Sequence, residues 1–272
     1  MLYLVATPIG HLSDITLRAL ETLKACDYIL CEDTRHTLLL LNHYHIHKPL
    51  KSFHKFNEAL KEDAVIHDLL SGQSIALVSD AGTPGISDPG AKLVQRCVAE
   101  GVLIQAIPGA CAAVVALSCS GFNTNRFQFI GFLPRKSGEL RRALQEILFY
   151  PGTSICYESA RRLVDALQQL SDLAPSREIA IGRELTKKFE EIRRGPAAEQ
   201  LSYWKATDIK GEIVLLIAED SASKTQEWEN LTPQEHVDLL QRTYQLSHRD
   251  AIKMAAEIRG VPKRNIYNAT LD

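Results

Sequence analysis

The sequence lacks the short motifs that mark two large classes of nucleotide-binding enzymes. No G-x-G-x-x-G follows the first predicted strand, where the residues read ATPIG, and no G-x-x-x-x-G-K-[ST] occurs anywhere in the chain. These two patterns hold the phosphates of dinucleotides and of nucleoside triphosphates. A dinucleotide-dependent dehydrogenase and a P-loop NTPase are therefore disfavoured.

The sequence also lacks the usual spacings of a metal site. None of its six cysteines forms a C-x-x-C pair, which disfavours a zinc ribbon and a thioredoxin-type site. The cysteines lie in apolar stretches, so we expect buried, reduced thiols in a reducing compartment. His43, His45 and His47 alternate along the chain, but no carboxylate or cysteine lies close by in sequence. A solvated loop is the favoured interpretation, and no metal is predicted.

Long hydrophobic runs and an excess of positive charge are missing as well. The most apolar stretch, Ala110–Cys119, has about half the length of a membrane-spanning helix. The N-terminus, MLYLVATPIG, does not have the charge and apolar pattern of a signal peptide. With 31 Lys and Arg against 33 Asp and Glu, the net charge is -2. We expect a cytoplasmic protein with no membrane partner, and any nucleic-acid surface would have to be local.

What is present is an ordinary globular composition, with 45% apolar and 24% charged residues in 272. In the first half, short apolar runs alternate with helical patterns, which predicts a parallel sheet covered on both faces. The predicted strands are Leu2–Thr7, Tyr28–Cys31, Leu50–Phe53, Ile75–Ser79 and Leu103–Ile107, and the predicted helices are Ile15–Ala25, His36–Asn42, Glu58–Leu70, Ala91–Glu100 and Ala110–Ser120. We expect Asn123–Phe132 to close this unit.

The order of the patterns changes from about Ser137 onward and predicts a mixed α+β sheet. The predicted strands are Ser154–Tyr157, Glu178–Arg183, Phe189–Arg193 and Glu212–Ala218, and the predicted helices are Leu140–Phe149, Ala160–Leu170 and Ala197–Lys205. Three short helices follow at Pro233–Gln245, His248–Arg259 and Lys263–Ala269. The fold class is therefore α/β. Its predicted organisation is a parallel α/β domain over 1–133, a second α/β domain over 134–220, a linker over 221–230 and a helical module over 231–272.

The most informative stretch is Ser79–Gly90, which reads SDAGTPGISDPG. It lies between a predicted strand and a predicted helix, at the edge of a parallel sheet where ligands bind. Its glycines allow a close approach of the backbone to a ligand, and Asp88-Pro89 is typical of a helix start. The alternative is a turn that only connects two elements. So many special residues favour a ligand site.

Two further polar groups follow neighbouring predicted strands. Glu32-Asp33-Thr34-Arg35 comes after the second strand. Asp33 or Thr34 could cap the next helix, but capping does not explain Glu32 or Arg35, which suit substrate binding or proton transfer. His54, Asn57 and Glu58 come after the third strand, where another helix start is an equally good interpretation.

The order of these segments resembles that of the tetrapyrrole-methylase-like superfamily. The matching segments are ATPIGHLSDIT, EDTRHT, VSDAGTPGISDPG, IPGACAAVVAL, YES, RELTK and KGEIVLLI. EDTRHT and DAGTPGISDPG are similar, within that superfamily, to the branch of bacterial 16S ribosomal RNA cytidine-2′-O-ribose methyltransferases. The likeness runs from about Leu2 to Ala218, and the helical tail also resembles that branch.

This resemblance implies two α/β domains with S-adenosylmethionine in the cleft between them. It also implies a homodimer that acts on 16S ribosomal RNA or the small ribosomal subunit. Carried over by position, the cofactor-binding residues are Asp80, Ala81, Gly82, Thr83, Ile86, Pro108, Gly109, Ala110, Tyr157, Gly195 and Pro196.

Transfer of a methyl group to a ribose hydroxyl needs a group that takes the hydroxyl proton. Glu32, Asp33, Glu158 and Lys187 are the candidates, and the sequence does not choose among them. Arg35, Arg183 and Lys187 suit the phosphates next to the target nucleotide. In the helical tail we expect RNA contacts from Arg249, Lys253, Lys263 and Arg264.

Three alternatives stay open at this point. The tail could instead be a small bundle that stabilises the dimer or the second domain. The same fold could serve a tetrapyrrole methyltransferase, which would have no need of a basic tail. A non-catalytic RNA-binding assembly protein is the third alternative, and the intact glycine-rich loop argues against it.

Overall fold

The computed structural model describes residues 1–220 and 231–270, and the predicted linker 221–230 lies outside them. The chain forms two compact units. Unit 1 contains residues 1–119 together with residues 182–191, and unit 2 contains residues 120–181 and the rest of the chain from residue 192. Each unit is built around its own β-sheet, as the sequence predicts.

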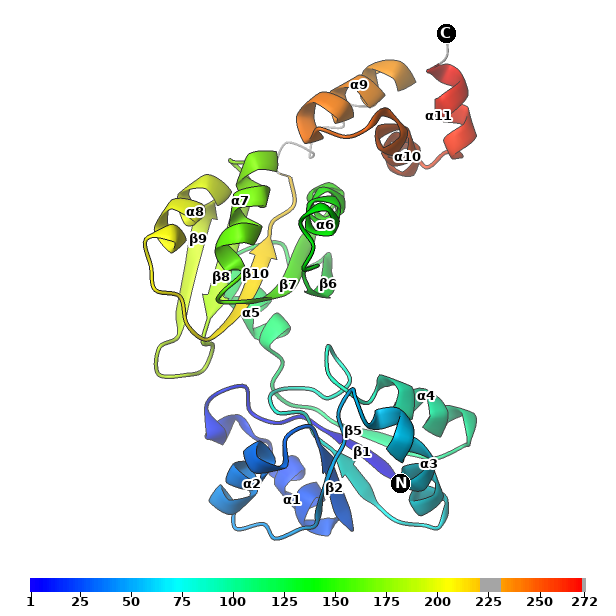
Figure 1. Ribbon diagram of the computed structural model, residues 1–272, viewed down its shortest axis with the longest axis vertical. Coiled ribbons are helices and arrows are strands. Elements are labelled where there is room, and N and C mark those ends of the chain that lie inside the picture. The colour runs from blue at the N-terminus through cyan, green and yellow to red at the C-terminus, as the bar shows by residue number, and fades with distance from the viewer. Residues whose placement is uncertain (221–230, 271–272) are drawn as a thin grey trace. The chain divides into compact units, whose positions relative to one another are not determined.

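The sheet of unit 1 has the strand order β3-β2-β4-β1-β5, and every pair of neighbours is parallel. Its strands are β1 (Leu2–Val5), β2 (Tyr28–Cys31), β3 (Leu50–Ser52), β4 (Ile75–Leu77) and β5 (Ile104–Ile107). The helical elements between and after them are η1 (Leu12–Asp14), α1 (Leu17–Ala25), α2 (Thr34–His43), α3 (Glu58–Leu70), α4 (Ala91–Ala99) and α5 (Ala112–Ser120) (Figure 1). Because all five strands are parallel, the loops that follow them all begin at the same side of the sheet, where the carboxyl ends of the strands lie.

Alternate strand residues form two separate apolar cores in unit 1. Leu2, Leu30 and Leu77 pack with side chains of α3 and α4 on one face of the sheet. Ile29 and Ala76, one position away in sequence, pack with α1 and α2 on the other face. Successive side chains of a strand point to opposite faces. A sheet buried on both sides therefore needs the continuous apolar runs that the sequence has there.

The sheet of unit 2 is mixed, with the order β6-β7-β10-β8-β9. Its strands are β6 (Phe127–Phe132), β7 (Thr153–Ser159), β8 (Glu178–Arg183), β9 (Glu191–Pro196) and β10 (Glu212–Ile217). Its helices are α6 (Ser137–Phe149), α7 (Leu163–Leu173) and α8 (Ala197–Lys205). All three helices contribute to one core with the strands, including the fully buried Trp204 of α8. The predicted mixed sheet is confirmed.

One predicted strand belongs to the other sheet. We expected Asn123–Phe132 to close the first unit, but β6 pairs with β7 of unit 2, with a bulge between Phe129 and Gly131. The division between the compact units accordingly falls after Cys119, whereas we predicted a boundary after residue 133. A strand pattern does not say which sheet will receive the strand, because that depends on partners distant in sequence.

The C-terminal helices α9 (Pro233–Tyr244), α10 (His248–Arg259) and α11 (Lys263–Ala269) agree with the predicted pattern. Thr232 and Glu235 form a capping box at the start of α9, and Ser247 caps α10. The three helices share a small core centred on Val237, Ala255 and Ile266. No helix within residues 1–220 and 231–270 is long and apolar enough to cross a membrane.

Candidate active site

The glycine-rich loop after β4 is tied to the end of β1. The backbone N–H of Thr7 donates to the carbonyl of Gly82 at 2.9 Å, and the N–H of Gly82 donates back to Thr7 at 3.1 Å. The Thr7 hydroxyl also donates to the carbonyl of Ser79 at 3.1 Å. Gly82 has φ +84°, a conformation that favours glycine, and it is buried. We expected its backbone to approach a ligand, but both of its polar backbone groups bond Thr7.

The loop after β5 lies against the same region. The Thr83 hydroxyl donates to the carbonyl of Ala110 at 3.2 Å. A side chain at Gly109 would lie 2.9 Å from Cβ of Ala6, so only glycine allows this close packing. Pro108 and Gly109 are exposed, and so is the apolar side chain of Ile86. The structure therefore brings Asp80, Ala81, Thr83, Ile86 and residues 108–110 to one edge of unit 1.

Asp33, at the end of β2, is committed to local structure. Its carboxylate accepts from the backbone N–H of Arg35 at 2.8 Å, as the N-cap of α2, and from Nε and Nη2 of Arg35 at 3.1 and 2.6 Å. These hydrogen bonds lower the pKa of Asp33. The capping interpretation of this residue is confirmed. A carboxylate stabilised in its charged form is a weak proton acceptor.

Glu32 differs from its neighbour. The Glu32 side chain makes no hydrogen bond or ion pair with the residues that the structure describes. Burial raises its pKa, and the nearby charges of Asp80 and Asp33 act in the same direction while that of His54 opposes them. A half-buried carboxyl with a raised pKa is a better proton acceptor than an ordinary carboxylate. Of the acidic candidates, Glu32 is the one that local contacts leave available.

Glu158, the acidic candidate of unit 2, is part of a buried ion pair. Its Oε2 lies 3.0 Å from Nη2 of Arg162, and its Oε1 accepts from the backbone N–H of Ser159 at 2.7 Å. The same guanidinium donates to the carbonyls of Leu133 and Pro134 at 2.9 and 2.8 Å. Burial raises the pKa of Glu158, but its side chain has no exposed surface. This carboxyl holds Arg162 and the chain after β6, so we no longer favour it as a base.

Lys187 and Arg183 lie in the segment 182–191, which belongs to unit 1. Lys187 forms an ion pair with Glu184 at 2.9 Å, and Arg183 pairs with Glu191 at 3.1 Å. The segment packs on the loop after β1, where a side chain at Gly10 would lie 2.5 Å from Cγ of Lys187. Lys187 thus lies at the β1 loop, and each of the two cations has a carboxylate beside it.

The other predicted cofactor residues lie in unit 2. The Tyr157 ring packs edge-on against Phe129 and Phe132, at centroid distances of 4.9 and 5.7 Å. Gly195 has φ +143°, and Pro196 directly precedes α8. Their role in cofactor binding stays a prediction.

All four predicted RNA-binding cations of the helical module are exposed. Arg249 and Lys253 lie on α10, and Lys263 and Arg264 lie on α11. Arg259 of α10, by contrast, donates to Nδ1 of His236 at 3.1 Å and to the carbonyl of Leu231. The module also contacts α6, because Gln145 donates to the carbonyl of Tyr244 at 3.0 Å and the Phe149 ring packs at a tilt against the Tyr244 ring, with the centroids 4.1 Å apart. It therefore stabilises unit 2 and still presents cations.

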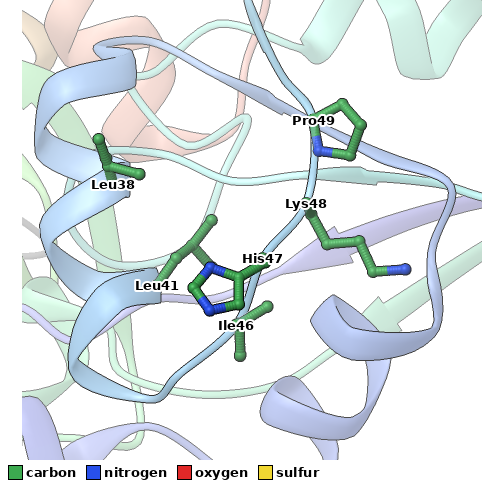
Figure 2. Close-up of a pocket in the computed structure, with 6 residues that line it drawn as sticks. All are labelled: Leu38, Leu41, Ile46, His47, Lys48 and Pro49. Carbon is green, nitrogen blue, oxygen red and sulfur yellow. The ribbon is translucent and has the colours of Figure 1, made fainter.

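The alternating histidines do not come together. No cluster of three or more His, Cys, Asp or Glu side chains that could hold a metal occurs in the described parts of the chain. His47 instead lines a pocket of about 390 Å³ with Leu38, Leu41, Ile46, Lys48 and Pro49 (Figure 2). This pocket lies between the end of α2 and the start of β3, at the sheet edge opposite to the glycine-rich loop.

Sequence reasoning gave too little weight to the group after β3. The Asn57 side chain makes no capping hydrogen bond to α3 within the described structure, although it occupies the N-cap position. Its amide contacts His54 and Ser52 instead. Glu58 is buried and accepts from the backbone N–H of Gly90 at 3.2 Å. The signal in the sequence was a third polar cluster at the end of a third parallel strand.

Comparison with known proteins agrees with this arrangement. Residues 1–200 match the family model described as tetrapyrrole (corrin/porphyrin) methylases. A crystal structure of uroporphyrin-III C-methyl transferase from Thermus thermophilus, complexed with S-adenyl homocysteine, is similar in fold, with a TM-score of 0.58 at 16% identity over 80% of this chain and 97% of that one. The chain therefore belongs to the tetrapyrrole methylase family and is a methyltransferase.

Much more similar relatives define the group within that family. Proteins named ribosomal RNA small subunit methyltransferase I are 47% identical in Halalkalibacterium halodurans, over 98% of this chain and 93% of the relative, and 45% identical in Escherichia coli O157:H7, over 100% and 94%. The match includes the helical module, which lies beyond the residues that the family model covers.

Proposed function

We propose that this chain transfers the methyl group of S-adenosylmethionine to the ribose 2′-hydroxyl of a cytidine in 16S ribosomal RNA. The coarser part is established by relatives that are 42–47% identical over nearly the whole chain: it is an S-adenosylmethionine-dependent methyltransferase of small-subunit ribosomal RNA. The finer part, the ribose 2′-hydroxyl of a cytidine, follows from the resemblance of the segments EDTRHT and DAGTPGISDPG. The observation in the structure that supports it is the Glu32 carboxyl beside the glycine-rich loop, which makes no hydrogen bond with the described residues and could accept the proton of a hydroxyl.

The carboxyl edge of unit 1 fits the cofactor. The loops 79–86 and 108–110 are joined there by the Thr83–Ala110 hydrogen bond, and they leave the backbone of residues 108–109 and the apolar Ile86 uncovered. Small side chains and free backbone groups suit the methionine and nucleoside parts of such a ligand. When bound, S-adenosylmethionine supplies a methyl group on a positively charged sulfur. The resemblance alone assigns Tyr157, Gly195 and Pro196 to the same ligand.

The chain's own residues activate and place the substrate. Glu32 accepts the proton of the ribose hydroxyl, because a neutral hydroxyl is a weak nucleophile. Arg35, whose side chain is 89% exposed, and Lys187 attract the neighbouring phosphates. Arg183 is a further candidate for that task, and like Arg35 and Lys187 it has a carboxylate beside it. Positioning of the two reactants supplies a further part of the acceleration.

The helical module is proposed to dock the chain on its substrate through Arg249, Lys253, Lys263 and Arg264. Exposed cations on neighbouring helices can reach phosphates, and each contact adds a salt-dependent increment of affinity. We also propose a homodimer, which sedimentation of the purified chain would test, and a cytoplasmic location, where ribosomal subunits are found.

Mass spectrometry of nucleosides tests the proposed reaction. Small-subunit RNA from cells with and without this protein is digested, and 2′-O-methylcytidine is measured. We expect its loss without the protein and its return with the wild-type chain. Unchanged 2′-O-methylcytidine would contradict the proposal, and methylation of uroporphyrinogen by the purified chain would favour the tetrapyrrole alternative.

The cofactor site has its own test. Gly82→Ala should weaken S-adenosylmethionine binding, measured by calorimetry, because φ is +84° and the new Cβ would lie 3.3 Å from Ile9. Gly72→Ala is the matched control, since Gly72 has φ +95° and a Cβ added there would have none of the described atoms within 4 Å. Equal affinities of the two variants would place the cofactor elsewhere.

A further inference from the structure

The hydrogen bonds around His54 determine which of its ring nitrogens carries the proton. The backbone N–H of His54 donates to Oδ1 of Asn57 at 2.8 Å, which fixes the orientation of the Asn57 amide. Nδ2 of Asn57 then lies 3.1 Å from Nε2 of His54 and 3.3 Å from Oγ of Ser52. Because Nδ2 can only donate, Nε2 must accept. A neutral His54 therefore carries its hydrogen on Nδ1.

This Nδ1–H group is buried without a partner among the residues that the structure describes. A buried donor without an acceptor is unfavourable, so native proteins usually provide one. The polar groups of Ser52 bond other residues, because Lys61 donates to its carbonyl and hydroxyl at 2.6 and 2.8 Å and Nδ2 of Asn57 lies 3.3 Å from that hydroxyl. The Nδ1–H group of His54 is therefore an oriented donor that has no acceptor among the described residues.

A candidate acceptor, the Glu32 carboxylate, directly follows the adjacent strand β2. The backbone N–H of Phe53 donates to the carbonyl of Cys31 at 2.7 Å, so Glu32 and His54 each leave the sheet one residue beyond this bond. His54 and the Glu32 carboxyl are close enough to interact electrostatically, as are Asp80 and Asp33 with the same carboxyl. Glu32 itself makes no hydrogen bond with the described residues. The Nδ1–H donor of His54 and the Glu32 carboxylate thus both lie at the carboxyl ends of the paired strands β2 and β3, and neither has a hydrogen-bond partner among the described residues.

We propose that His54 is a positioning residue whose Nδ1–H donates to the Glu32 carboxylate when the ribosomal substrate is bound. Asn57 fixes the tautomer, and His54 fixes the carboxylate that takes the proton of the 2′-hydroxyl. The ribose oxygen then forms the new bond to the methyl carbon, the bond between that carbon and sulfur breaks, and the proton stays on Glu32 until solvent removes it. This inference rests on the proposed function.

Two substitutions of similar size separate this role from a general structural one. In His54→Asn the amide nitrogen takes the place of the donating Nδ1, whereas in His54→Gln the amide oxygen takes the place of the accepting Nε2 and the Nδ1–H donor is lost. We expect His54→Asn to keep single-turnover methylation of small subunits within a few-fold of wild type. His54→Gln should lower it about 10- to 100-fold, with calorimetric S-adenosylmethionine affinity and melting temperature unchanged. Loss of the donor should also move the acidic limb of the rate–pH profile to higher pH, because the charged form of the Glu32 carboxyl would lose a hydrogen bond that stabilises it.

A double variant shows whether His54 acts through Glu32. In a Glu32→Gln background, His54→Gln should cause no further loss of rate. Three results would overturn the positioning role. The losses of rate from Glu32→Gln and His54→Gln could multiply in the double variant, His54→Asn and His54→Gln could lose the same rate, or the His54→Gln chain could be as active as wild type. A wild-type chain that does not methylate the subunit would overturn the proposed function as well, so the two failures can be told apart.

Discussion

Glu32 and Glu158 illustrate how two similar sites in one chain come to differ. Glu32 directly follows β2 and Glu158 is the second-last residue of β7, each is at least half-buried, and burial raises the pKa of both. Glu158 has Arg162 at 3.0 Å and the N–H of Ser159 at 2.7 Å, whereas Glu32 has two carboxylates for neighbours and no hydrogen bond within the described residues. A raised pKa alone does not identify a base. The partners decide whether the carboxyl is available.

The largest effect that would test this comparison is expected from Glu32→Gln. Removal of a general base usually lowers a rate by about 10²–10⁴-fold, so we expect at least a 100-fold slower single-turnover methylation. S-adenosylmethionine affinity should stay within a few-fold of wild type. Lys187→Met is the companion variant, and full activity of Glu32→Gln together with a slow Lys187→Met would make Lys187 the favoured base.

Glu158→Ala should lower the free energy of unfolding. It leaves the Arg162 guanidinium without its carboxylate, and loss of one partner of a buried pair costs about 3–5 kcal/mol. Because the Arg162 side chain is 27% exposed, we expect about 2 kcal/mol, read as a lower urea midpoint. Glu158→Gln keeps the shape and should lose less. A stable but inactive Glu158→Ala chain would show that this carboxyl does take part in the reaction.

The helical module should affect affinity for RNA and leave the chemistry intact. Replacing Arg249, Lys253, Lys263 and Arg264 by alanine avoids the buried residues of the module. We expect about 10-fold weaker binding to small subunits and a shallower dependence of affinity on salt concentration, with cofactor affinity unchanged. Arg242→Ala is a control on α9, outside the proposed surface. Unchanged salt dependence in the fourfold variant would favour a purely structural module.

The smallest effect concerns stability against pH at two adjacent residues. The raised pKa of Glu32 means that the folded chain holds a proton which the unfolded chain has released, so stability falls as pH rises through that window above about 4.3. The lowered pKa of Asp33 has the opposite sign: its contribution is present above about 3.9 and is lost as pH falls toward the folded-state pKa. Thermal melts of Glu32→Gln and Asp33→Asn across pH 3–7, relative to wild type, should therefore change in opposite directions.

Most of the fold could be predicted because the patterns are local. The helix Glu58–Leu70 and the last two helices have the predicted bounds, and the first sheet is parallel as expected. The strand β6 was predicted for the wrong sheet, because its pairing with Thr153–Ser159 depends on residues far away in sequence. Four of the cysteines are buried as expected, but Cys119, at the end of an apolar helix, is exposed.

In the candidate site, too, some features follow from the local sequence and others depend on contacts between distant parts of the chain. The sequence by itself determined the residue types at the ends of the strands, the glycines that the loops require and the family to which the chain belongs, because these depend on short spacings and on order. Only the tertiary structure decided the partners of the three carboxyls. Asp33 caps α2, Glu158 forms an ion pair with Arg162, and Glu32 makes no hydrogen bond with the described residues. The physical reason is that the availability of a carboxyl depends on hydrogen-bond partners and burial, which the fold brings together from separate strands.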